Sequence, residues 1–354
     1  MPIALTLALF LMAIRVSPEP AQPAPATTLP RFRLTLLQVP AGIEQSTAVA
    51  INERGQIAGL VLPPWEAQPF YFTAFWSDAQ ALAEIATGPG TDFATPSDVG
   101  PSGLVLGNGF IDGFGGGGVP FTWIAGEDIE PLADVGDITA VFVCGINDRG
   151  VLVGEAVFPE LLSARPTRWD HGVPQALRLV PGDHSGNAFA ISDSGHIVGR
   201  SGELAARWLG TEVQRLEFPN AADSIAVDVN DRGFAVGDAF VGSSGGFQAV
   251  LWRGTEGVAL PTLGGGLSRA YAINDRDWIA GTSEAFPPIA TSLDDLRATL
   301  WIHEQAYDLN ELTVDLPAGV VLTAAWDLND TGQIVGRAIV DDLPRAFLLD
   351  RVDL

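Results

Sequence analysis

The chain repeats one short pattern of apolar and polar positions. In Ala325–Gly336, AWDLNDTGQIVG, small or apolar residues first alternate with polar ones. A period of two is typical of a half-buried β-strand. The segment Asn329–Gly332, NDTG, then favours a tight turn, because Asn and Asp can bond their own backbone and Gly accepts a positive φ. The β-branched residues that follow predict a return strand, so the whole pattern predicts a β-hairpin.

Six further segments carry this pattern. They recur at intervals of roughly 40–50 residues, which suits a four-stranded propeller blade rather than a helical solenoid. Two copies deviate in the turn: the degenerate Ser97–Gly107, SDVGPSGLVLG, and Ala270–Gly281, where Asp277 stands in place of the turn Gly. The remaining copies are Ala48–Gly59, Val143–Gly154, Ala188–Gly199 and Ala226–Gly237.

Each hairpin is followed by a short apolar segment that predicts a third strand. It ends in Trp in six units, whereas the last unit has Phe-Leu-Leu at 347–349. A fourth strand is clearest at 258–266, and the chain stops before a fourth strand of the seventh unit. We expect the N-terminal strand, about 32–39, to complete the last blade and close the ring, which removes exposed sheet edges. The predicted fold is therefore all-β: a seven-bladed β-propeller with four-stranded blades over residues 30–354.

These units resemble the HAF repeat family, which is found in predicted extracellular bacterial proteins. The family motif is approximately A-x-A-I-N-D-x-G-x-I-V-G, followed by a His-Ala-Phe-type strand with Trp. Ala74-Phe75-Trp76 and Ala346-Phe347-Leu348 match the Ala-Phe part, and the His is missing. The resemblance covers about residues 30–354. It implies the propeller-like fold and an extracellular location, but no activity, because the family has no common established activity.

The N-terminal segment predicts secretion. Residues 3–14 form an apolar run that is too short to span a membrane and has the length of a signal-peptide core. Ala24-Pro25-Ala26 resembles a cleavage site, and the Pro-rich residues 18–30 resemble a flexible linker. We assign residues 1–29 to the signal peptide and linker; the alternative is a disordered start. The mature protein is expected to be secreted, periplasmic or on the cell surface, without membrane insertion.

Composition narrows the classes of partner. The net charge of −24 and the pI near 4.3 argue against nucleic acid and against anionic membrane surfaces, because both require basic patches. The charge fits a solvated secreted protein, which we expect to be a monomer. Cys144 is the only cysteine, so no internal disulfide forms, and we expect a buried, unreactive thiol.

The variable segments between second and third strands are the candidate binding loops. By analogy with other propellers, they share a face with the connections between blades. Aromatic side chains beside carboxylates suit a saccharide or peptide platform, although loops that pack against each other have the same composition. The residues that we predict to form this ligand-binding face are Trp65, Tyr71, Phe114, His184 and Arg269.

The sequence contains no convincing catalytic set. Gly242–Gly246 fits G-x-S-x-G, but it lies in a Gly/Ser loop between two strands, whereas a nucleophile elbow needs a helix after it. The Asp-x-Asn-Asp turns that begin at Asp228 and Asp327 resemble the start of a calcium loop but lack its closing Glu, so we interpret them as hairpin turns. The four histidines lack metal-ligand spacing; they are His171, His184, His196 and His303.

We therefore predict a non-enzymatic binding module without cofactor or metal, whose ligand is a saccharide, a cell-surface polymer or a protein. One alternative is a hydrolase or lyase that gathers loop carboxylates, such as Asp112, Asp294 and Asp295, at the mouth of the ring. The other alternative is a structural or adhesive surface protein.

Overall fold

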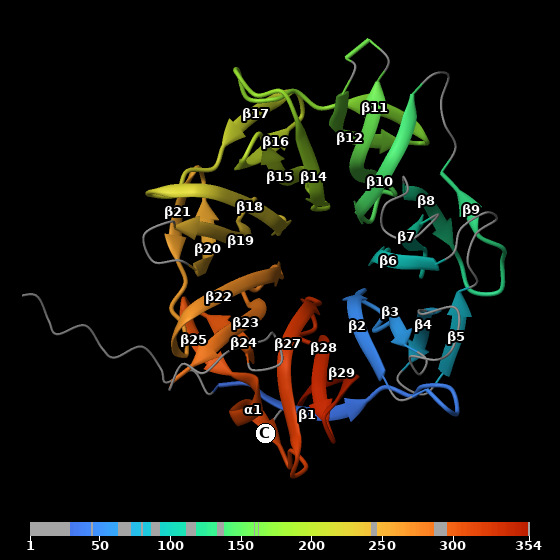
Figure 1. Cartoon of the computed structure of the whole chain (residues 1–354), viewed down its shortest axis with the longest axis vertical. Helices are drawn as coiled ribbons and strands as arrows, with labels where there is room; N and C mark the ends of the chain where they lie inside the picture. The colour runs from blue at the N-terminus through green and yellow to red at the C-terminus, as the bar shows by residue number, and fades with distance from the viewer. Residues whose placement is uncertain are drawn as a thin grey trace, which may run out of the picture.

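The chain folds into seven β-sheets arranged around a common centre (Figure 1). This arrangement confirms the predicted seven-bladed β-propeller. The computed structural model describes residues 29–352 except 44, 63–71, 79–80, 86–92, 111–117, 133–137, 159, 162, 242–245 and 287–295.

Blades one to six are meanders whose neighbouring strands pair antiparallel and run in chain order from the centre outwards (Figure 1). Blade one comprises β2 (Gln45–Ile51), β3 (Ile57–Leu62), β4 (Phe72–Asp78) and β5 (Ala81–Ile85). Blade two comprises β6 (Phe93–Val99), β7 (Val105–Phe110), β8 (Gly118–Trp123) and β9 (Glu130–Pro131). Blade three comprises β10 (Thr139–Ile146), β11 (Leu152–Phe158), β12 (Ser163–Asp170) and β13 (Val173–Ala176).

Blades four to six have the same order. Blade four comprises β14 (Gly186–Ile191), β15 (His196–Ser201), β16 (Leu204–Leu209) and β17 (Glu212–Arg215). Blade five comprises β18 (Ala221–Val229), β19 (Ala235–Val241), β20 (Gly246–Arg253) and β21 (Glu256–Ala259). Blade six comprises β22 (Gly264–Ile273), β23 (Ile279–Ala285), β24 (Arg297–Ile302) and β25 (Gln305–Asp308).

Blade seven joins the two ends of the described chain. Its strands β27 (Val320–Leu328), β28 (Ile334–Val340) and β29 (Leu343–Val352) are followed outwards by β1 (Arg31–Leu36), which pairs antiparallel with β29. The short β26 (Thr313–Val314) adds in parallel to the other side of β1. The N-terminal strand therefore closes the ring, as predicted, although it begins and ends slightly earlier than the expected 32–39.

Helix is almost absent from the described residues. The helix α1 (Leu309–Leu312) has four residues and lies between β25 and β26. Within the described ranges, no helix is long and apolar enough to span a membrane.

The hairpin turns follow the residue types of the repeat. In blade seven, the Gly332 N–H donates to the Asn329 carbonyl, and Gly332 has a φ of 91°. In blade six, Asp277 occupies the turn-Gly position and has a φ of 60°. Asp tolerates this left-handed conformation better than most residues, so the turn survives the substitution.

The last Gly of the repeat is required by close contact between strands. A Cβ on Gly336 would lie 2.0 Å from the Ala324 carbonyl oxygen, and a Cβ on Gly237 would lie 1.9 Å from that of Ile225. Such distances are far below van der Waals contact, so any side chain here would push the first two strands of the blade apart. Steric exclusion of any side chain therefore explains why the repeat ends in Gly.

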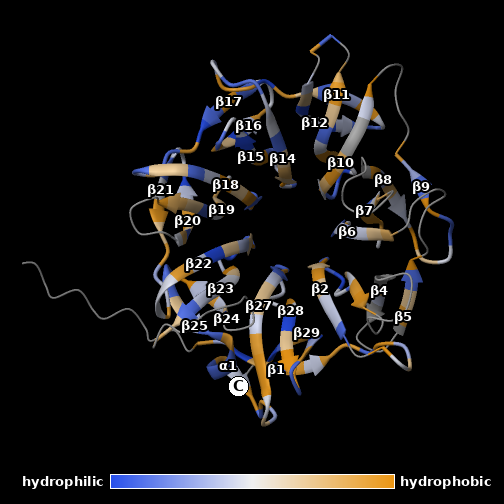
Figure 2. Cartoon of the chain, viewed as in Figure 1, coloured by the Kyte–Doolittle hydropathy of each residue, from blue (hydrophilic) through white to orange (hydrophobic). Residues whose placement is uncertain are grey.

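Tryptophan side chains of the third strands fill the space between blades. Five of them are almost completely buried: Trp76, Trp169, Trp208, Trp252 and Trp301. In four blades the indole N–H donates to a carbonyl in the connection from the preceding blade. These pairs are Trp76–Gln38, Trp208–Arg178, Trp252–Glu217 and Trp301–Pro261. Outer strands such as β17 and β25 are more hydrophilic than the inner strands (Figure 2). The buried tryptophans therefore place the core between the blades.

Closure by β1 generates the first prediction. Phe32 is fully buried in the cluster between blades six and seven, whereas its neighbour Arg33 is exposed. Phe32→Ala should lower the free energy of unfolding by about 3–5 kcal/mol, because it leaves a cavity at the closing strand. Arg33→Ala should change it by less than about 0.5 kcal/mol. Urea denaturation measures both, and equal effects would contradict a closing role for β1.

Candidate functional site

In five of the seven blades, the asparagine that begins the hairpin turn ties its blade to the next one. Asn329 lies in blade seven, and its Nδ2 donates to the Asn52 carbonyl of blade one at 3.0 Å. Both side chains are almost fully buried. The same bond recurs in four other places: Asn52 to Gly100, Asn147 to Ser192, Asn230 to Asn274, and Asn274 to Asn329. The turns thus form a ring of hydrogen bonds around the centre.

In five blades, the acidic residue that follows the first turn residue adds a second bond between blades. Its carboxylate accepts the turn N–H of the preceding blade, as Asp330 does from Asp275 at 2.7 Å. Equivalent bonds run from Asp148 to Asp193, from Asp231 to Asp275 and from Asp330 to Glu53, and a related bond runs from Ser194 to Asp231. These hydrogen bonds from N–H to ionised groups are stronger than neutral ones.

Blade two, the degenerate copy, uses different residues. Gly100 and Pro101 replace the turn Asn and acid, and proline has no N–H to donate. Instead, Asp98 Oδ2 accepts the Ile146 N–H at 2.9 Å. Asn108 also bonds both backbone groups of Val143. The junction between blades two and three is therefore bridged despite the altered turn.

Three aspartates occupy the same position of the inner strand, two residues before the turn. They are Asp98, Asp228 and Asp327. One oxygen of each accepts the N–H of the following residue, and the other accepts an N–H of the next blade. Burial raises the pKa of Asp98 to about 6 and that of Asp228 to about 7, although these bonds oppose the shift. Burial likewise raises the pKa of Asp327 well above its usual value.

The turns and the ends of all seven inner strands surround a cavity of about 310 Å³ at the centre, which we call the channel cavity. Nine carboxylates line it, and none of the described lining residues is Lys, Arg or His. Burial also raises the pKa of Glu53, Asp193 and Asp275 at its mouth. The carboxylates are Glu53, Asp98, Asp148, Asp193, Asp228, Asp231, Asp275, Asp327 and Asp330. Such a cavity favours positively charged ligands.

Three further lining side chains alter the character of the cavity. Tyr271 and Trp326 stack at 4.4 Å between ring centres, and burial raises the pKa of Tyr271 to about 12. Cys144 is only partly buried, contrary to our expectation, because its strand position faces the cavity. Burial nevertheless raises the pKa of its thiol to about 12, which keeps it protonated and unreactive. Among the described residues, no three acidic, thiol or imidazole groups converge on a metal position.

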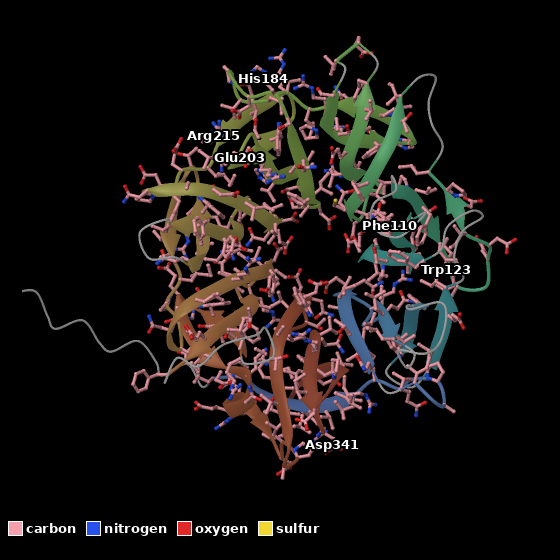
Figure 3. The ribbon with its side chains drawn as sticks, viewed as in Figure 1. Phe110, Trp123, His184, Glu203, Arg215 and Asp341 are labelled. Carbon is pink, nitrogen blue, oxygen red and sulfur yellow. The ribbon has the colours of Figure 1, made fainter. Side chains whose placement is uncertain are left out.

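The predicted ligand-binding residues do not form this site. Trp65, Tyr71 and Phe114 lie outside the described residues, as do Asp112, Asp294 and Asp295. His184 is exposed on the connection between blades three and four, at the outer edge of the ring (Figure 3). Arg269 lies on β22, where its guanidinium packs 3.8 Å from the Phe247 ring centre and 3.8 Å from Asp238. Neither of the two lines the channel cavity.

Sequence reasoning placed the ligand at the opposite end of the blades. In an antiparallel meander, the turns between first and second strands lie at one end, and the connections between blades lie at the other. We interpreted the Asn-Asp turns as simple hairpin turns, whereas they also join blades and line the cavity. The signal was present: six of the seven units place Asp or Glu directly after the first turn residue.

Comparisons with known proteins support the fold. Neither a family model nor a curated sequence matches the chain, so membership of the HAF repeat family stays a prediction. A streptogramin B lyase structure shares 10% identity over 91% of this chain and 98% of its own, with a TM-score of 0.53. The β-propeller domain of the Trilobed protease from Pyrococcus furiosus shares 12% identity over 88% of this chain and 99% of its own, also with a TM-score of 0.53. The TM-scores support a shared propeller fold, and at these identities the likeness says nothing about activity.

The raised pKa of Asp228 generates the second prediction. Between the ordinary pKa of Asp, about 3.9, and about 7, the folded state holds a proton that the unfolded state releases. The stability that this proton contributes is complete at low pH and is lost as the pH rises through about 7. Asp228→Asn cannot titrate, so the stability advantage of the wild type over this variant should shrink by about 1 kcal/mol or more between about pH 5 and about pH 8.

Urea denaturation of both proteins at the two pH values measures this change. A difference between wild type and Asp228→Asn that stays constant with pH would contradict the raised pKa.

Proposed function

We propose that this protein is a non-enzymatic binding module whose ligand is a positively charged segment of a partner protein, held at the mouth of the channel cavity. The observation that carries the proposal is the set of acidic side chains around one cavity, six of them on the turns at its mouth, without a basic lining residue among the described ones. Of the ligand classes open at the sequence level, a protein is the one that readily supplies several Lys or Arg side chains. Neutral saccharides and anionic polymers gain nothing from this field.

The arrangement of the channel carboxylates favours binding over acid–base catalysis. Asp98, Asp228 and Asp327 have raised pKa values, which is a common property of catalytic acids. However, both oxygens of each carboxyl group accept backbone N–H groups, so these aspartates hold blades together. A catalytic acid or base needs an oxygen that can reach the substrate. The alternative of a hydrolase or lyase therefore has less support than binding.

We also propose that the protein acts outside the cytoplasm. The support is the apolar run at residues 3–14, which has the length of a signal-peptide core and lies outside the described residues. The strongly acidic composition suits a partner whose binding surface is basic.

Asp148 provides the test of the proposed ligand class, because its carboxylate accepts no backbone N–H of the described residues and instead lies beside the carboxylate of Asp193. Its place in the ring explains this: the preceding blade offers Pro101, which has no N–H. Asp148 is exposed and lines the mouth. Asp148→Asn should weaken the binding of a fluorescent hexalysine peptide about threefold to fivefold at low salt, as expected for the loss of one partly solvated charge pair.

Asp341→Asn is the matched control. Asp341 is exposed at the β28–β29 turn, at the other end of the blade and on the outer edge of the ring (Figure 3). This substitution removes the same charge, so it should change the dissociation constant less than about twofold if binding is local. Fluorescence anisotropy measures both variants. Equal weakening by the two would show that the peptide responds to net charge alone, and the proposal would fail.

A further inference from the structure

A second cavity, of about 300 Å³, lies between blades three and four at the end of the blades that carries the turns; we call it the interblade cleft. Its floor is apolar, whereas its polar walls are mainly basic. The apolar residues are Val151, Ile191 and Ile197, and the polar ones are Arg149, Arg168, Asp170 and His171. Gly195 and Gly210 complete the lining and leave it open, because they have no side chains. The character of this cleft is thus the opposite of that of the channel cavity.

The repeat shows why this cleft exists. Arg168 immediately precedes the core Trp of β12 and lies opposite Val153. At this position most other blades place an apolar residue that packs against the next blade. These residues, all buried, are Phe75, Leu251, Leu300 and Leu348. In blade three a guanidinium stands where four other blades place a buried apolar side chain; blade four also has an arginine here, Arg207, but it bonds Gln214.

Arg168 is held in place but retains free hydrogen-bond donors. Its Nη2 donates to Asp170 Oδ2 at 2.8 Å, and Asp170 Oδ1 lies 2.7 Å from His171 Nδ1. The hydrogen bond from His171, together with Arg168, lowers the pKa of Asp170, so the carboxylate is ionised and orients both side chains. The Nε of Arg168 is buried and has no hydrogen-bond partner. A buried donor without a partner costs free energy that a bound acceptor would recover.

Arg149 adds a second guanidinium to the cleft, and this one has no partner among the described residues. Two arginines at the same turn position bond the next blade: Arg232 donates to the Asp275 carbonyl and Arg276 to that of Asp330. The Arg149 guanidinium, in contrast, forms no hydrogen bond or ion pair with the residues described. It lies beside Gly195, where an added Cβ would be 3.1 Å from its Nη2. Gly195 therefore leaves the approach to this guanidinium open.

We propose that the interblade cleft binds the oxyanion of a small organic acid, a carboxylate or a phosphate monoester, with its apolar part on the Val151–Ile197 floor. Guanidinium groups suit such oxyanions because their planar donors match the geometry of the acceptor oxygens. The protein carries a net charge of −24, so its overall field repels anions. Any saturable binding of an anion must therefore come from a local site. This site is independent of the proposed binding of a basic partner, and either can fail alone.

Isothermal titration calorimetry of the full chain, at constant ionic strength, tests the proposal with three probes: benzoate, phenyl phosphate and inorganic phosphate. We expect one-to-one binding of benzoate or phenyl phosphate, and the tighter of the two identifies the head group. Inorganic phosphate should bind more weakly than phenyl phosphate, because it cannot use the apolar floor. Equal binding of the two phosphates would overturn the role of the floor, and no saturable binding of any probe would overturn the site.

Variants locate the binding. Arg168→Leu restores the residue type of other blades and should weaken binding by at least about tenfold, as expected for the loss of a charge-assisted hydrogen bond. Arg149→Gln, at an exposed turn, should weaken it in the same direction without affecting folding. The matched control is Arg207→Leu, because Arg207 holds the equivalent position in blade four and bonds Gln214. The proposal would be overturned if Arg207→Leu weakened binding as much as Arg168→Leu does. It would also be overturned if Arg168→Leu folded and bound the probe with unchanged affinity.

Discussion

The propeller depends on hydrogen bonds between the turns of successive blades. A single blade cannot bury both of its faces, so the fold requires every blade to find its neighbours in one register. The buried turn asparagines set that register, because each must satisfy its amide on the carbonyl of the next turn. Where the turn lacks asparagine, other residues bridge the blades: Asp98 and Asn108 in blade two, and Ser194 in blade four. The constraint is therefore the bridge between blades, and the residue that forms it can change.

The same bridges create the electrostatic character of the channel cavity. Carboxylates such as Asp275 and Asp330 are near the mouth because they accept N–H groups of the preceding turn. Burial raises the pKa of Glu53 and Asp275, and repulsion from neighbouring carboxylates adds a smaller part of the shift. Backbone donors offset part of the repulsion, so the ring tolerates a density of negative charge that free side chains would avoid. The fold and the proposed ligand preference thus have one origin. Asp148 is the carboxylate whose substitution tests the second without removing a backbone bond of the first.

The sequence was sufficient to predict the architecture because each feature of the fold recurs in it. The turn, the closing Gly and the third-strand Trp appear in nearly every unit, and the strand-poor end of the last unit predicts closure by the N-terminal strand. The candidate site was not predicted, because the sequence does not show at which end of the blades a side chain lies. The site also depends on bonds between residues that are far apart in the chain, such as Asp330 and Glu53. Periodicity reveals that a position recurs, but not whether it faces solvent, a neighbouring blade or the channel. The interblade cleft has a similar cause: Arg168 is visible as an exception only after its register with Leu251 and Leu300 is known.

Closure by β1 has a consequence for synthesis. Ribosomes make Arg31–Leu36 long before its partner Leu343–Val352. Throughout translation this strand has both hydrogen-bonding edges unsatisfied and can pair with other chains. Its sequence, RFRLTL, places two arginines beside Phe32 in a protein that has only 19 basic residues. Charges that flank an apolar strand act as gatekeepers against aggregation. These arginines thus suit a segment that must remain unpaired until the rest of the ring is complete.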